Sequence, residues 1–302
     1  MGRLLIGTTS WTEKTLLDSG LFYPRTARTA EARLRYYAEQ FPIVEVDSSY
    51  YGLPSERNSA LWVERTPPGF VFDVKAFRLF TLHQTPLDAL PVEVRERLGK
   101  VEKKNVYYDD LPAAARDDLW ERFRSALQPL RAEGKLGAVV FQFPPWVVNR
   151  RSNRDHVLEC ARRLPGDAIA VEFRNRTWFD AGNGERTVAF ERDSGLANVI
   201  VDEPQGFSSS IPAVWEVTTP ELAVVRLHGR NRDTWEKKGL ATAAERFDYR
   251  YSTSEMKALA GPIAELGERA GTVHVLFNNC YRDHAQANAA ELAEILGARA
   301  AP

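Results

Sequence analysis

Eight short apolar runs recur along this chain of 302 residues and constrain its fold more than any other feature. Each has about the length of a β-strand and is rich in β-branched or aromatic residues. Most are separated by segments with helix-start and helix-stop signals, and strands that alternate with helices form parallel βα units. Eight such units predict an α/β protein, a single (β/α)8 TIM-like barrel, for which about 250 residues are typical. The runs span residues 4–7, 43–47, 70–76, 138–143, 168–173, 197–202, 222–228 and 272–278.

Local signals refine this outline. Ser152 with Asp155 resembles a helix-capping box, and Ser254 is placed to begin a later helix that Pro262 is expected to kink. The sequence GTTSW at 7–11 begins with the last residue of the first run and offers hydroxyls and backbone N–H groups that could cradle an anion. It is no nucleotide-binding fingerprint, and a plain tight turn is the favoured interpretation.

The longest gap lies between the third and fourth runs and holds a charged insertion at about residues 88–112. Its RER and EKK clusters predict a solvated excursion between strands 3 and 4 rather than a second domain. We therefore expect residues 1–302 to form a single TIM-barrel domain.

Charge and cysteine content restrict the partners and the compartment. Forty basic against forty-one acidic residues give a net charge of −1, so no overall positive field attracts nucleic acid or membranes. No apolar run is long enough for a membrane-spanning helix, and the first residues do not resemble a signal peptide. The two cysteines, Cys160 and Cys280, are far apart and indicate no disulfide framework, so we expect a cytoplasmic protein with free thiols.

Polar residues near the ends of the apolar runs point to the functional end of the barrel. Side chains alternate along a strand, so parity assigns each residue to the inside or the outside of the barrel. The C-terminal ends of barrel strands form the catalytic mouth. The residues that parity places inward are Glu45, Asp47, Lys75, Gln142, Glu172, Arg174, Asp202, Arg226, His228 and Asn278.

Two interpretations of these residues stay open: a catalytic or ligand site, and an ion-pair network that only fills the upper barrel. Buried ion pairs contribute little net stability, which favours the functional interpretation. Trp11, Trp178 and Trp235 each follow a strand end. Each of them can wall the pocket, where it would stack on a ring, or plug the space between loops.

An anion site is expected after the seventh run. Loops at this position of a barrel often hold phosphate, and Arg226, His228 and Arg230 lie there with Asn278 from the neighbouring strand. Asp202 is the expected competitor, because it can pair with Arg226. No histidine-rich metal centre is supported and no cofactor is expected, although one hard cation on the carboxylates stays open.

Many ordered motifs also resemble one family. The chain is similar to the YecE-like family, catalogued as domain of unknown function 72, from residue 6 to about residue 292. This resemblance implies a TIM-like barrel and supplies no chemistry. The motifs are GTTSW at 7–11, LFYP at 21–24, VEVDSSYY at 44–51, KA at 75–76, TLH at 81–83 in place of a family Thr-His pair, FQFPP at 141–145, VEFR at 171–174 with Trp178, VD at 201–202, VRLHGR at 225–230 and FNN at 277–279.

The favoured function is a metal-independent acid–base hydrolase or lyase for a small anionic or sugar-like ligand. Glu172 beside Arg174 would stay ionised as base or nucleophile, Glu45 would be the acid, and Lys75 is an alternative base or Schiff-base former. Paired carboxylates suit a glycosidic or N-glycosidic bond. The predicted catalytic residues are Glu45, Lys75, Glu172 and Asp202; the predicted substrate-binding residues are Trp11, Asp47, Gln142, Arg174, Trp178, Arg226, His228, Arg230 and Asn278.

Two other functions remain. One is a nucleic-acid-binding protein that acts on a flipped base, which the neutral charge disfavours. The other is a non-enzymatic sensor of a small ligand, which a barrel fold does not exclude.

Overall fold

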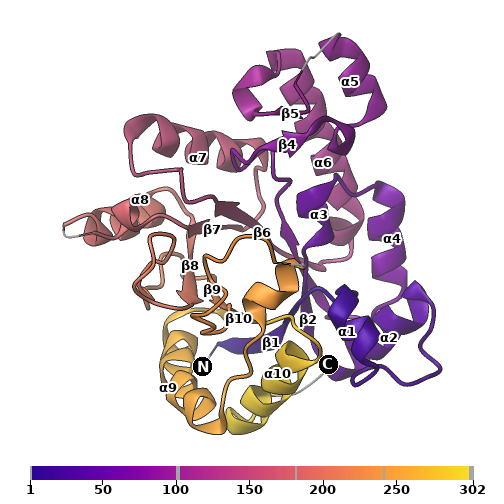
Figure 1. Cartoon of the computed structure of the whole chain (residues 1–302), viewed down its shortest axis with the longest axis vertical. Coiled ribbons are helices and arrows are strands. Elements are labelled where there is room, and N and C mark those ends of the chain that lie inside the picture. Colours follow the sequence, from indigo (N-terminus) through magenta and orange to yellow (C-terminus); the bar gives the residue numbers. More distant parts are fainter. Residues whose placement is uncertain (1, 100–102, 181, 241, 299–302) are drawn as a thin grey trace.

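The computed structural model describes residues 2–99, 103–180, 182–240 and 242–298, and its centre is a closed barrel of parallel strands (Figure 1). The neighbours around the barrel are β1-β10-β9-β8-β7-β6-β3-β2. Each predicted run coincides with one barrel strand, so the predicted barrel is confirmed. The strands are β1 (Arg3–Thr9), β2 (Ile43–Val46), β3 (Val71–Lys75), β6 (Leu136–Phe143), β7 (Ile169–Phe173), β8 (Ala197–Asp202), β9 (Leu222–Leu227) and β10 (Thr272–Phe277).

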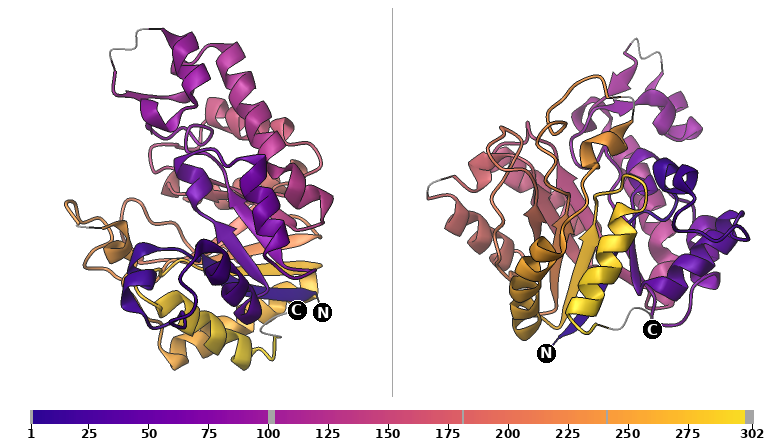
Figure 2. Two further views of the ribbon diagram at one scale, coloured as in Figure 1. Left: turned by 90° about the vertical axis from the view of Figure 1, so that its right-hand side faces the viewer. Right: turned by 60° about the horizontal axis from the view of Figure 1, so that its bottom comes forward.

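Helices surround this barrel, and Figure 2 shows α9 and α10 side by side against β10 and β1. The α-helices are α1 (Lys14–Ser19), α2 (Ala30–Gln40), α3 (Ser48–Tyr51), α4 (Glu56–Glu64), α5 (Val92–Leu98), α6 (Ala113–Ala132), α7 (Arg151–Arg163), α8 (Gly184–Asp193), α9 (Thr253–Arg269) and α10 (His284–Ile295). The 3-10 turns are η1 (Leu87–Ala89), η2 (Tyr108–Asp110), η3 (Arg176–Trp178) and η4 (Ala243–Phe247).

Two expected helix starts were misplaced. Helix α7 begins at Arg151 without a side-chain cap, so Ser152 lies inside its first turn. Helix α9 is capped by Ser252 rather than Ser254, because Glu255 stands three residues after Ser252 and completes a capping box. Pro262 lies inside α9, which continues past it as one helix.

The GTTSW segment at 7–11 is part of strand β1 up to Thr9 rather than a turn. Gly7 is required there because a Cβ atom would lie 2.0 Å from the carbonyl oxygen of Ile43 on β2. The expected tight turn is confined to Ser10 and Trp11, and Ser10 has a left-handed backbone with φ of 68°.

The insertion is more than a solvated excursion. It contains α5 and β5 (Asn105–Val106), and β5 pairs antiparallel with β4 (Thr85–Pro86), which directly precedes the insertion. Leu90, Val94 and Val106 are buried and join the same apolar core as Leu119 of α6. The charges therefore cover one side of a segment whose apolar side packs on the barrel's helices; residues 100–102 lie outside the described part.

The connection from β8 to β9 has no helix, and all of residues 203–221 are described. This loop covers the outer side of β8, where the Asn198 amide donates to the carbonyl of Val214 at 3.0 Å. The backbone N–H of Asn198 donates to the Thr218 hydroxyl at 2.8 Å. A polar residue therefore faces outward on β8, because the cover is a loop with free carbonyls rather than an apolar helix face. No helix of the described part is long and apolar enough to cross a membrane.

Candidate functional site

A hollow of about 430 Å³ opens at the C-terminal ends of the barrel strands, and we call it the mouth pocket. Its walls come from the ends of β1, β3, β6 and the loops after β2, β7 and β10, with the η4 turn on one side. The lining residues are Thr9, Ser10, Thr12, Glu13, Asp47, Ser48, Tyr50, Tyr51, Lys75, Gln142, Arg174, Ala244, Phe247, Asn278 and Cys280.

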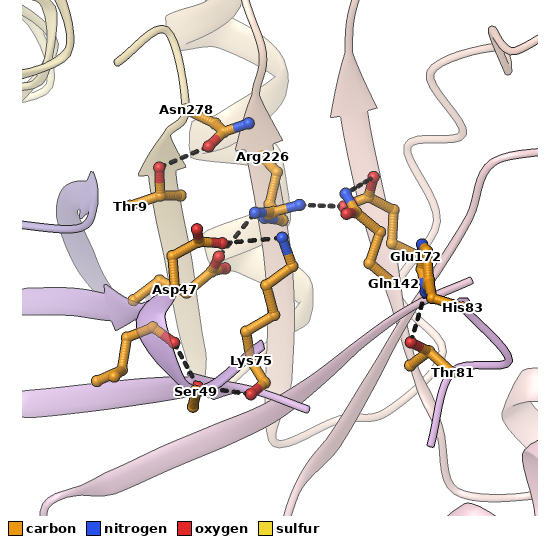
Figure 3. A network of polar contacts seen from close by, with 12 residues as sticks. Thr9, Asp47, Ser49, Lys75, Thr81, His83, Gln142, Glu172, Arg226 and Asn278 are labelled. Atoms are coloured by element: carbon orange, nitrogen blue, oxygen red, sulfur yellow. Dashed lines mark hydrogen bonds and ion pairs between the residues drawn. The ribbon is translucent and has the colours of Figure 1, made fainter. Parts of the chain in front are cut away.

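An ion pair forms one side of this pocket, and we call Asp47 and Lys75 the pocket wall (Figure 3). The Lys75 ammonium donates to Asp47 Oδ1 at 2.8 Å and lies 4.6 Å from the centre of the Tyr50 ring. The two side chains keep 11% and 28% of their surface exposed. Burial alone would raise the pKa of Asp47, but Lys75 outweighs it and the pKa is lowered. The wall therefore presents opposite charges to a ligand.

A second charge cluster lies beneath the pocket and has no exposed surface; we call Glu45, Glu172, Arg226 and His228 the pocket floor. Arg226 from β9 bridges two strands. One arm of its guanidinium donates to Glu172 on β7 (Figure 3). The other donates to Glu45 Oε1 on β2 at 2.7 Å. One fully buried cation thus holds two carboxyls inside the barrel.

The pKa values of the two floor carboxyls are shifted in opposite directions. Burial raises the pKa of Glu45, whose second oxygen has no hydrogen-bond partner among the described residues. Burial also acts on Glu172, but Arg226 and then His228 outweigh it and hold its pKa well below the usual range. Glu172 Oε1 also accepts from Gln142 at 2.7 Å and from Arg174 at 3.4 Å. Glu172 is therefore an ionised anchor for the side chains around it.

A chain of neutral groups connects the pocket to this anchor. The Thr9 hydroxyl donates to Oδ1 of the Asn278 side-chain amide at 2.6 Å. The Asn278 amide can then donate to His228 Nδ1 at 2.8 Å, which leaves the proton of His228 on Nε2, 3.2 Å from Glu172. Burial lowers the pKa of His228 to about 4, so the ring is neutral at pH 7. The chain fixes one tautomer and leaves no His228 nitrogen free for a ligand.

The structure corrects the place of Asp202. Val199 and Val201 belong to the apolar cluster inside the barrel, whereas Ile200 belongs to the cluster outside it. Asp202 shares the parity of Ile200 and so points outward, and the inward carboxyl is the next one, Glu203. Glu203 is buried 3.3 Å from Arg174, and burial raises its pKa to about 7. Sequence parity missed Glu203 because it lies one residue beyond the run at 197–202, whose last residue, Asp202, was assigned to the inside.

The expected anion site is not assembled. Arg226 is paired with two carboxyls, and His228 is buried against Glu172. Arg230 lies away from the pocket-lining residues and donates to Asp202 at 2.7 Å and to Glu255 at 3.1 Å. Asp202, which the sequence predicted as the partner that would neutralise Arg226, thus pairs with Arg230 instead.

The three tryptophans are buried and line none of the pocket. Trp178 stacks on Phe173 with ring centres 3.6 Å apart, which corrects its place as a pocket wall. Trp11 packs edge-on against Trp62, and Trp235 lies under Arg174 at 5.1 Å. Of the two predicted roles, pocket wall or plug between loops, the buried positions of Trp11, Trp178 and Trp235 agree with the plug.

The exposed aromatic residues near the mouth are different ones. Tyr51 and Trp146 keep 56% and 58% of their surface exposed. The rings of Tyr50 and His83 lie between them, at edge-to-face distances of 5.0 Å, 5.2 Å and 5.6 Å along the series. Sequence reasoning did not select Tyr51 or Trp146 as site residues; the available signals were the VEVDSSYY motif and the tryptophan that directly follows FQFPP.

His83 enters the mouth from the loop after β3. Its Nδ1 is 2.8 Å from the Thr81 hydroxyl (Figure 3), and burial together with Lys75 and Arg78 lowers its pKa to about 3. Leu82 between them has φ of 63°, a conformation that a branched residue adopts only at a cost of about 1–2 kcal/mol. Such strain often accompanies a functional loop.

Neither a metal centre nor a reactive thiol is evident. Within the described part of the chain, no three His, Cys, Asp or Glu side chains converge as metal ligands do. Cys280 lines the pocket, but burial raises its pKa to about 12, so it stays a protonated thiol.

Comparison with known proteins gives consistent results. The family model described as "Protein of unknown function DUF72" matches residues 5–302. The UPF0759 protein YunF of Bacillus subtilis is 31% identical over 295 residues, which cover 97% of this chain and 94% of that protein. A DUF72 family protein of Thermotoga maritima has 30% identity and a TM-score of 0.74 over 98% of this chain and 99% of that one. A DUF72 family protein of Enterococcus faecalis has 26% identity and a TM-score of 0.79 over 98% and 96%.

Proposed function

This chain belongs to the DUF72 family of proteins of unknown function, and we propose that its mouth pocket is the active site of an acid–base enzyme, a hydrolase or lyase for a small polar molecule. The observation that carries this proposal is the Asp47–Lys75 pair at 2.8 Å, which is partly exposed above a floor of buried charges that pair with one another. A pair needed only for stability gains little from such a position.

The two wall groups have complementary chemistry. Asp47 is ionised and can take a proton from a substrate hydroxyl or from water. Lys75 can stabilise the negative charge that develops on the reacting oxygen, or donate a proton to the leaving group. A Schiff base at Lys75 is disfavoured, because its nitrogen is engaged by the Asp47 carboxylate and by the face of Tyr50.

The floor residues have positioning roles in this proposal. Glu45 and Glu172, which the sequence favoured as acid and base, have no exposed surface and do not line the pocket. Glu172 instead orients Gln142 and Arg174, and Asn278 is oriented by Thr9 and His228. Gln142, Arg174 and Asn278 are the side chains that bind the substrate in this proposal.

The test measures turnover by the purified full chain on nitrophenyl esters, phosphates and glycosides. Asp47→Asn and Lys75→Met should each lower kcat/KM at least 100-fold, the usual scale of acid–base catalysis. Both should keep the thermal unfolding midpoint within a few degrees. The matched control is Arg97→Met, which breaks the exposed pair with Asp118 at 3.0 Å and should leave turnover unchanged.

Two outcomes contradict the proposal. Full turnover in both wall variants would remove Asp47 and Lys75 from the chemistry. Ligand binding by the wild-type chain without turnover on any of these substrates would instead favour the small-ligand sensor.

A further inference from the structure

Two exposed aromatic side chains extend the mouth pocket outward, and we infer that Tyr51 and Trp146 form a stacking rim for a neutral carbohydrate. This inference rests on the proposed function, because it names the substrate class of the same site. It adds a second binding position: one sugar ring occupies the pocket beside Asp47 and Lys75, and the next ring lies on the rim.

Trp146 is held in its exposed position from several sides. Its indole N–H donates to the carbonyl oxygen of Leu82 at 3.2 Å, on the strained turn that carries His83. Two prolines precede it, and their fixed φ angles stiffen the turn. Behind the turn, the buried Trp178 donates to the carbonyl of Val147 at 2.8 Å. A large aromatic ring kept rigid and 58% exposed is presented for contact.

The rim is continuous with the reacting groups. Tyr51 itself lines the mouth pocket, and its ring meets that of Tyr50 edge-on at 5.0 Å. Lys75 lies over the face of Tyr50 at 4.6 Å, so Tyr50 is shared by the rim and the pocket wall. On the other side, His83 joins Tyr50 to Trp146. A ligand that reaches from Lys75 to Trp146 therefore follows an unbroken aromatic surface.

The charges of the pocket favour a neutral ligand. Among the described lining residues, each cation already contacts a carboxylate: Lys75 contacts Asp47, and Arg174 contacts Glu172 and Glu203. A nucleic acid brings a phosphate with every nucleotide and needs uncompensated basic residues, which the described lining of the pocket does not present. Arg78, 5.2 Å from the centre of the Tyr50 ring, is not part of this lining. The neutral overall balance, a net charge of −1, agrees with this.

The remaining lining groups match a sugar. A pyranose has an apolar C–H face and a ring of hydroxyl groups that both donate and accept hydrogen bonds. The apolar face suits an exposed aromatic ring. The hydroxyls suit the carboxylate of Asp47 and the amides of Gln142 and Asn278, all of which line the pocket.

The test compares ligand affinity by saturation-transfer NMR and calorimetry on the full chain. The probes are methyl pyranosides and disaccharides of glucose, galactose and mannose, together with adenosine monophosphate and a single-stranded DNA dodecamer. At least one disaccharide should bind about tenfold more tightly than its methyl monosaccharide. Trp146→Ala should remove about that tenfold gain while leaving monosaccharide affinity unchanged, because an aromatic contact has this magnitude. Tyr51→Ala should also lower disaccharide affinity about tenfold, and because Tyr51 lines the pocket it should weaken monosaccharide binding as well.

Matched variants separate stacking from loss of fold. Trp146→Phe and Tyr51→Phe keep a ring and should retain most of the disaccharide affinity. Tyr107→Ala removes an aromatic side chain that is 46% exposed and does not line the pocket, and it should change nothing.

Each contrary result overturns the inference. Binding of the DNA or the nucleotide that depends on Trp146 would assign the rim to nucleic acid. No binding of any sugar, or unchanged disaccharide affinity in both alanine variants, would remove the carbohydrate rim. These failures differ from failure of the proposed function, which is read from turnover of Asp47→Asn: turnover retained with rim-dependent sugar binding would spare the rim and reject the acid–base pair.

Discussion

The floor and the wall of the mouth pocket use the same kinds of charged residue in opposite settings. In the floor, Arg226, Glu45 and Glu172 have no exposed surface, and each positive arm meets a carboxyl. In the wall, Asp47 and Lys75 keep part of their surface open. Charges in the floor are therefore fixed by mutual pairing in a medium of low polarity, whereas those of the wall can exchange their partner for a ligand.

This difference in exposure separates residues that position other side chains from residues that can react with a substrate. A buried ion pair is costly to break, because each partner left alone has lost its water. A partly exposed pair is cheap to break, because water replaces the missing partner. The groups that a substrate can reach therefore belong to the wall. The floor holds the wall and the amides of Gln142 and Asn278 in fixed positions.

The largest expected effect comes from removing the floor's cation. Arg226→Met leaves two carboxyls buried without their partner and should lower the free energy of unfolding by about 3–5 kcal/mol. Lys75→Met in the wall should cost about 1 kcal/mol or less, since Asp47 is 28% exposed and can be hydrated. Urea denaturation of both variants measures the contrast.

The Arg226→Met loss should also shrink as the pH falls towards 4. Without Arg226 the pKa of both carboxyls rises, so protonation relieves the buried charges. Equal losses in the two variants, at any pH, would contradict the distinction between floor and wall.

The second effect concerns Glu203, which pairs with the pocket-lining Arg174 and through it is linked to Glu172 in the floor. Burial raises its pKa from 4.5 to about 7. Between these values the folded chain keeps a proton that the unfolded chain has released, so stability falls as the pH rises from about 4.5 to 7. The loss is about 3 kcal/mol, at about 1.4 kcal/mol for each unit of pKa.

Glu203→Gln should remove the part of this slope that Glu203 contributes, because an amide carries no titrating proton; Glu45 and Glu191, whose pKa burial also raises, keep contributing to the slope in the variant. Urea denaturation at closely spaced pH values, with Glu216→Gln at the exposed pair with Arg269 as the control, measures it. A slope in Glu203→Gln as steep as that of the wild-type chain would assign the titration to another group.

Barrel architecture and site residues were not equally predictable from the sequence. The eight apolar runs gave every barrel strand, because a strand buried on both faces needs a continuous apolar segment. Inward parity held where a strand alternates polar and apolar residues, as in Ile43–Val46 and its continuation to Asp47. It failed on β8, where Val199 and Val201 line the inside and Asn198 faces the covering loop.

The aromatic rim was missed for a different reason. The exposure of an aromatic side chain in a loop depends on how neighbouring loops fold, and the local pattern of apolar residues does not predict it. Trp178 and Trp146 both follow strand ends, yet the first is buried and the second is 58% exposed. Only the arrangement of the loops after β3, β6 and β7 distinguishes them.

A smaller effect is expected at the neutral chain that links the pocket to the floor. Asn278→Asp places a carboxylate against His228 Nδ1, where an amide now donates at 2.8 Å. The pKa of His228, which burial lowers to about 4, should rise by at least one unit, since the protonated ring would then lie between two carboxylates. NMR titration of the ring proton measures this shift, and Asn278→Ser is the control that adds no charge. An unchanged pKa would mean that Asn278 does not face Nδ1.

The smallest effect is expected outside the barrel, at Arg230, which the sequence placed in the anion site. Arg230 is 38% exposed and pairs with Asp202, whose other contact is the hydroxyl of Tyr251 at 2.7 Å. Arg230→Ala should lower the free energy of unfolding by less than about 1 kcal/mol, because Tyr251 still donates to Asp202 and water reaches the vacated side. It should not change kcat/KM or ligand affinity, since Arg230 lines no part of the mouth pocket. Arg174→Ala is the matched comparison: it removes an arginine that does line the pocket, and it should weaken binding. If Arg230→Ala weakened phosphate or substrate binding as much as Arg174→Ala, the outer edge of β8 and β9 would belong to the site after all.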